Sequence, residues 1–220
     1  MRIELTPGEA RVIGCLIEKE IITPAQYPLS LSALTSACNQ KSSRYPVLQL
    51  REPEVQQIVD GLLKRHLVSD RSGFGSRVTK YKQRFANVGF GSLEFTAQEL
   101  GVLCVLLLRG PQTAGELRIR TNRLCHFEDV AETETVIEGL MKRSDGPFVV
   151  RLARDTGTRE PRYAHLFGDQ EAEPSPAVSA TEAPPSERRL DQLEELVLEL
   201  QESLDEIKLR LTRLEDGAGR

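Results

Sequence analysis

The sequence predicts a mainly α fold of the α+β class, in which two copies of one small unit follow each other along the chain. Three observations support this: an internal repeat, helical spacing of apolar residues, and an alternating segment that ends each copy. The repeat is clearest between VQQIVDGLLKR at 55–65 and TETVIEGLMKR at 133–143. Three further matches occur in the same order: LTPGE at 5–9 with FTAQE at 95–99, LTSACN at 34–39 with LRIRTN at 117–122, and KYKQRF at 80–85 with RYAHLF at 162–167. Each copy therefore holds about 80 residues.

The first copy begins with a helix whose start has clear signals. Thr6 is an N-cap followed by Pro7, and Glu9 completes a capping box. A short second helix is expected over 31–38, entered from Pro28, and a third begins at Glu52 or Pro53. The residues that follow, 67–85, alternate around two glycines and predict a two-stranded hairpin.

The second copy predicts the same order of elements. Helices are expected over 96–109, 114–122 and 129–143, followed by strands over 148–154 and 162–167. Three helices closed by a hairpin are typical of the winged helix, a variant of the helix-turn-helix. We therefore expect two tandem winged-helix domains, at residues 1–90 and 91–168.

The C-terminal segment has a different composition. Residues 169–187 are rich in Pro, Ala, Ser and Glu, which is typical of a disordered linker. Over 188–216, apolar residues recur at alternating spacings of three and four, which favours a coiled-coil helix and a homo-oligomer. A single amphipathic helix that packs its apolar stripe on the body is the alternative. Dimer and trimer both remain open. The expected contact positions are Leu190, Leu193, Val197, Leu200, Leu204, Ile207, Leu211 and Leu214.

Part of the first copy resembles a known family. The block CLIEKEIITPAQYPLSLSALTSACNQKSSRYPV at 15–47, with RVTKYKQRF at 77–85, closely resembles the YceH family of bacterial proteins. The resemblance covers about residues 3–168, and the C-terminal segment lies outside it. It implies a tandem winged-helix fold, and it supplies no catalytic residues.

Composition argues against several classes of function. No C-x-x-C pair joins Cys15, Cys38, Cys104 or Cys125, so the expected role of these cysteines is that of small buried apolar residues. The histidines are His66, His126 and His165, which lie far apart. We expect no enzyme activity, no cofactor and no metal. The longest apolar run is too short for a membrane span and no secretory signal opens the sequence, so we expect a cytoplasmic location.

The charge distribution suggests a nucleic-acid partner. The net charge is −4, but residues 168–220 hold 14 acidic and 6 basic residues, whereas 1–167 hold 19 acidic and 23 basic residues. The third helix of each copy is acidic on its polar positions, which disfavours reading of base edges. Basic residues outside those helices suit contacts with the DNA backbone, which carry little sequence information. They are Lys41, Arg44, Arg71, Arg77, Lys80, Lys82 and Arg84. A solvated hairpin is the alternative interpretation.

A protein partner is the competing hypothesis. The segment YPVLQL at 45–50 holds four apolar residues in a loop that contains a proline: Tyr45, Val47, Leu48 and Leu50. These residues could dock a partner on a non-catalytic scaffold, or they could close the core of the first copy. Their exposure in the structure distinguishes the two alternatives.

Overall fold

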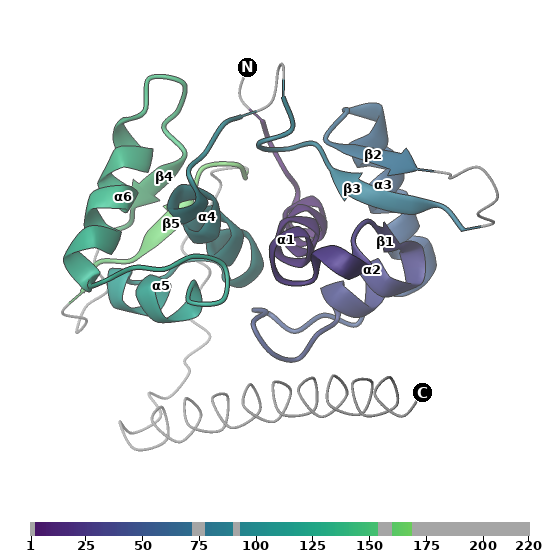
Figure 1. Cartoon of the computed structure of the whole chain (residues 1–220), viewed down its shortest axis with the longest axis horizontal. Helices are drawn as coiled ribbons and strands as arrows, with labels where there is room; N and C mark the ends of the chain where they lie inside the picture. The colour runs from purple at the N-terminus through teal and green to yellow at the C-terminus, as the bar shows by residue number, and fades with distance from the viewer. Residues whose placement is uncertain (1–2, 72–77, 90–92, 154–159, 169–220) are drawn as a thin grey trace, which may run out of the picture. The chain divides into compact units, whose positions relative to one another are not determined.

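The computed structural model describes residues 3–71, 78–89, 93–153 and 160–168, all of which belong to one compact unit. Within these residues the fold is α+β, with six α-helices and two small antiparallel sheets (Figure 1). The predicted linker, the eight coiled-coil positions and Arg77 lie outside the described residues.

The first half contains three α-helices and a three-stranded sheet. The helices are α1 (Pro7–Ile22), α2 (Leu31–Cys38) and α3 (Glu52–Lys64), and a short 3-10 helix, η1 (Pro24–Gln26), follows α1. The predicted capping box is confirmed, because Thr6 accepts the N–H of Glu9 and the Glu9 carboxylate accepts the N–H of Thr6. The strands are β1 (Leu29–Ser30), β2 (Val68–Arg71) and β3 (Lys80–Gln83), in the order β1-β3-β2.

The second half repeats the order of three helices and a hairpin. It contains α4 (Ala97–Arg109), α5 (Ala114–Arg120), α6 (Val130–Lys142), β4 (Val149–Arg151) and β5 (Tyr163–His165). Helix α5 ends at Arg120, two residues before its predicted end. The Thr121 hydroxyl donates to the carbonyl of Arg118 at 3.2 Å, and the N–H of Asn122, which would bond that carbonyl in a continuing helix, donates to Ile119 at 3.4 Å instead.

The two halves share one core. Helices α1 and α4 lie beside each other at its centre, with β2 and β3 on one side and α5 and α6 on the other (Figure 1). The approach is close, since a Cβ added at Gly14 would lie 2.8 Å from Cδ2 of Leu108. The Cys104 thiol donates to the Gly14 carbonyl at 3.4 Å, and the rings of Phe85 and Phe167 meet edge to face at 4.9 Å. These contacts hold the halves as one body.

Candidate nucleic-acid interface

The three-stranded sheet has a covered inner face and a polar outer face. On its central strand β3, Tyr81 and Gln83 are buried, whereas Lys80 is exposed and Lys82 is half-buried. The Tyr81 hydroxyl donates to Gln56 of α3 at 3.2 Å, and Gln83 donates to Glu20 of α1 at 2.8 Å. The predicted alternation, with the two lysines on one face and Tyr81 on the other, is therefore confirmed.

Strand register gathers positive charge on the outer face. Arg71 of β2 lies directly opposite Lys80, and directly opposite residues share a face of an antiparallel sheet. Arg84 is exposed and continues the alternation of β3 by one step. We call the set Arg71, Lys80, Lys82 and Arg84 the basic sheet face. The nearby carboxylate of Asp70 belongs to the opposite face, because Asp70 pairs with Tyr81.

The basic sheet face lacks internal compensation within the described part of the chain. None of its four side chains has a carboxylate of a described residue within ion-pair distance. Like charges directly opposite each other, as with Arg71 and Lys80, destabilise a sheet. A phosphate oxygen between them would replace repulsion with attraction. The geometry therefore suits contact with a polyanion.

The prediction that Arg44 contacts phosphate is wrong. Its side chain is 0% exposed, and its guanidinium donates to both oxygens of Glu18, at 2.9 and 2.6 Å. Arg123 of the second half donates to the same carboxylate at 2.6 Å. Burial alone would raise the pKa of Glu18, but the hydrogen bond and charge of Arg44, together with Arg123, hold it below its ordinary value. Arg44 is a structural residue of a buried charge cluster.

Lys41 is exposed, but it is not part of the basic sheet face. It lies three residues before Arg44, in the same loop. Glu18 binds both Arg44 of that loop and Arg123, which follows α5, so the loop lies near α5. In Figure 1, α5 and the β2–β3 hairpin lie on opposite sides of the molecule. The predicted basic residues therefore do not form one continuous surface.

The other arginines near α5 are engaged within the protein. Arg118 donates to the carbonyl of Glu128 at 3.0 Å, and Arg120 lies 3.4 Å from Glu116. They are less available to phosphate than the basic sheet face is. The exposed residues of α3 include Glu52, Gln57 and Asp60, so its exposed face carries acidic side chains.

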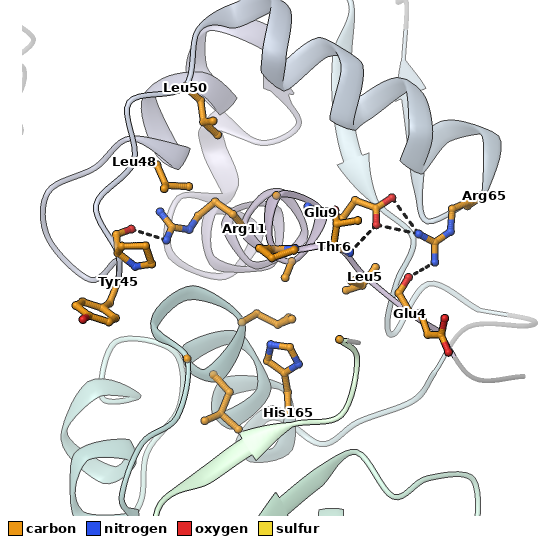
Figure 2. Close-up of a pocket in the computed structure, with 18 residues that line it drawn as sticks. Glu4, Leu5, Thr6, Glu9, Arg11, Tyr45, Leu48, Leu50, Arg65 and His165 are labelled. Carbon is orange, nitrogen blue, oxygen red and sulfur yellow. Dashed lines mark hydrogen bonds and ion pairs between the residues drawn. The ribbon is translucent and has the colours of Figure 1, made fainter. Parts of the chain in front are cut away.

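The predicted partner strip divides into exposed and half-buried residues. Tyr45 is 73% exposed and Val47 50% exposed, whereas Leu50 is half-buried and packs against the core. Leu48 is half-buried and lines a cavity next to Tyr45 (Figure 2). The docking and core interpretations each fit part of this segment.

Two of the described cysteines, Cys15 and Cys38, share a side-chain hydrogen bond. Cys15, Cys38 and Cys104 are buried free thiols, as predicted, and Cys125 is half-buried. No cluster of three metal-ligating side chains occurs among the residues described. Likewise, no helix within them has the length and apolar character needed to cross a membrane.

The buried charged residues were missed by reasoning from the sequence. Arg11 and Glu18 are 3% and 0% exposed, although both are charged. They lie seven residues apart in an otherwise apolar helical run, so they occupy the same face as buried residues. That spacing was the signal in the sequence from which the burial of both residues could have been predicted.

These features define a class of protein: an α+β protein of two similar halves, with small antiparallel sheets and a basic sheet face that no carboxylate of the described residues neutralises. The chain belongs to the family described as "Protein of unknown function, DUF480", which matches residues 5–158. It is 54% identical over 218 residues to a UPF0502 protein of Aeromonas hydrophila, covering 98% of this chain and 100% of that one. It is 53% identical to UPF0502 protein VPA1223 of Vibrio parahaemolyticus, covering 97% and 99%.

A third relative matches a shorter stretch more closely. UPF0502 protein VC_A0740 of Vibrio cholerae is 62% identical over 167 residues, which is 76% of this chain and 77% of that one. The longer matches extend into the C-terminal segment, beyond the range of the YceH resemblance.

Proposed function

We propose that the two halves are tandem winged-helix domains and that the protein is a non-catalytic binding protein that contacts the DNA backbone. The proposal rests on the repeated order of three helices and a hairpin, and on the YceH resemblance of the block at 15–47. In winged helices the hairpin is the wing, which commonly touches phosphate or the minor groove. The basic sheet face lies on the hairpin of the first half.

The observation that carries the proposal is the like-charged pair of Arg71 and Lys80. Their opposition in the strand register destabilises the free protein, and no described carboxylate relieves it. Lys82 and Arg84 extend the same face. Such a surface binds phosphates with strong salt dependence and weak sequence preference, because each contact releases condensed counterions.

The acidic exposed residues of α3 limit the role of that helix. A major-groove reader needs Arg, Lys, Asn or Gln toward the bases. Here Gln57 is flanked by Glu52 and Asp60, which repel the polyanion. We infer that the protein binds DNA through its backbone without reading a defined operator.

The test is fluorescence anisotropy of the full chain on a labelled random-sequence 25-base-pair duplex, at low and then moderate salt. Reversing Lys80, Lys82 and Arg84 together to Glu is expected to abolish binding at low salt. The matched control reverses three exposed basic residues of the second half and changes the net charge equally; they are Lys142, Arg151 and Arg162. Equal loss in both triple variants would show an effect of overall charge and refute the assignment to the basic sheet face.

A protein-binding scaffold is the second candidate. The exposure of Tyr45 and Val47 beside a cavity favours it. Absence of any anisotropy change at low salt would reject DNA binding and favour this alternative. The next step is then partner capture with the wild-type chain as bait. The double variant Tyr45→Ser/Val47→Ser serves as the control bait, which should fail to capture the partner.

A further inference from the structure

A cavity of about 1050 Å³ lies where the two halves meet. Its walls come from the start of α1, the loop at 45–50, α4 and β5 (Figure 2). Its volume reaches the upper end of the range found for small-molecule sites, which is about 300 to 1,000 Å³. Five leucines supply its apolar lining: Leu5, Leu48, Leu50, Leu106 and Leu107.

One wall of the cavity holds a buried cation that no carboxylate in the described part of the chain neutralises. Arg11 is 3% exposed, and it donates to the carbonyls of Cys38 at 3.0 Å and Pro46 at 2.7 Å. No carboxylate of a described residue lies within ion-pair distance of its guanidinium. Arg44, the other buried arginine of this half, has Glu18. A buried charge without a partner is unfavourable, and the five N–H groups of a guanidinium exceed the two bonds seen here.

At the opposite end of the cavity, the charge of Arg65 is neutralised by Glu9. Arg65 donates to both oxygens of Glu9, each at 2.9 Å, and also to the carbonyl of Glu4. The two ends are visible on either side of α1 in Figure 2. An occupant therefore meets the positive charge of Arg11 at one end of the cavity, and the carboxylates of Glu4 and Glu9 repel a second negative group at the other end.

Between the two ends, His165 supplies a neutral donor. Its Nδ1 accepts the N–H of Phe167 at 3.3 Å, which leaves the proton on Nε2. Burial lowers the pKa of His165 to about 4, so the ring is uncharged at neutral pH. Its ring extends from β5 toward α1 (Figure 2). It adds polarity to the cavity without adding charge.

We propose that this cavity binds a small amphipathic monocarboxylate, with its carboxylate on the Arg11 guanidinium and its apolar body along the leucines. One negative charge matches Arg11, with which no carboxylate of a described residue pairs, and the lining matches a hydrocarbon chain. The site stands independently of DNA binding, because the cavity shares no residue with the basic sheet face.

The experiment is isothermal titration calorimetry of the full chain with octanoate at pH 7, in the absence of DNA. 1-Octanol and octylammonium serve as neutral and cationic ligands with the same chain. Octanoate is expected to bind at least tenfold more tightly than either. NMR of the histidine side chains locates the ligand, since the His165 resonances are expected to shift and those of exposed His66 and His126 are not.

Two kinds of variant test the roles separately. Arg11→Met keeps the bulk of the side chain without its charge and is expected to weaken octanoate binding at least tenfold. Arg11→Lys keeps the positive charge and is expected to retain part of the octanoate affinity. A second pair of variants tests the site if Arg11→Met does not fold. Leu48→Glu places a repelling charge in the cavity, and its control, Gln49→Glu, places the same charge on a neighbouring exposed residue outside the cavity. Only Leu48→Glu should abolish binding. Equal affinity for 1-octanol and octanoate, unchanged binding in Leu48→Glu, or no binding of octanoate would each overturn the proposal.

Discussion

Replacing Glu18 with Gln should strongly destabilise the protein. Its carboxylate accepts three hydrogen bonds from two guanidiniums, at 2.6 and 2.9 Å from Arg44 and at 2.6 Å from Arg123. Glutamine keeps the shape but leaves the fully buried guanidinium of Arg44 without a counter-charge. Removal of one partner of a buried pair typically lowers the free energy of unfolding by about 3 to 5 kcal/mol. We expect a loss at the lower end of that range, because the amide oxygen still accepts one bond.

Urea unfolding at pH 7 measures this loss, with Glu138→Gln as the control. Glu138 pairs with Lys142 at 2.8 Å, but the two side chains are 62% and 75% exposed. An exposed pair contributes only about 0.2 to 1 kcal/mol, so Glu138→Gln should change little. A loss below about 1 kcal/mol in Glu18→Gln would refute the reasoning that Glu18 neutralises a fully buried Arg44 guanidinium.

The same cluster should give the wild type a specific dependence on pH. The pKa of Glu18 is lowered on folding, so its stabilisation is fully present above the unfolded value of about 4.3 and is lost as pH falls through the folded pKa. The difference in unfolding free energy between wild type and Glu18→Gln should therefore stay constant from pH 8 to 5 and shrink below pH 4. A constant difference down to pH 2 would contradict this assignment.

Three further perturbations have defined outcomes. Lys80→Ser should weaken DNA binding yet raise the unfolding free energy by about 0.2 to 1 kcal/mol in urea titrations, because it removes the like-charged pair with Arg71; a destabilised variant would contradict this. The pKa of His165 falls to about 4 on folding, so the unfolded chain binds more protons below pH 6.5. Between pH 7 and 5, the free energy of unfolding should therefore fall by about 2 kcal/mol more in wild type than in His165→Gln, and equal falls would show that this histidine is not buried in its neutral form. Gly14→Ala should lower the melting temperature, since its Cβ would lie 2.8 Å from Leu108, whereas Gly139→Ala meets nothing within 4 Å and should raise it.

Local signals were sufficient to predict the helices of the first half. The capping box at Thr6 and the apolar spacing after it lie within one helix, so the start of α1 could be read directly. Strand β1 gave no such signal, because two residues are too few for an alternating pattern and their pairing with Lys80 and Tyr81 spans about 50 positions. The location of Arg44 depended on similarly distant partners, since Glu18 is 26 positions away. A basic residue in a loop is normally solvated, and only the fold shows that this one is buried.

The shared core also limits how a ligand and DNA can influence each other. Helix α1 packs against α4 with Gly14 at the contact, and Glu18 fastens the loop before α3 to the region after α5. A rigid pair of halves presents a preformed cavity, so we expect octanoate to bind without closure of one half on the other. The ligand then has no differential affinity for two arrangements of the basic sheet face, and without such a difference it cannot shift DNA binding through domain motion. Equal DNA affinity with and without octanoate is therefore the expected result, and a change in that affinity would show that the core contact between α1 and α4 opens.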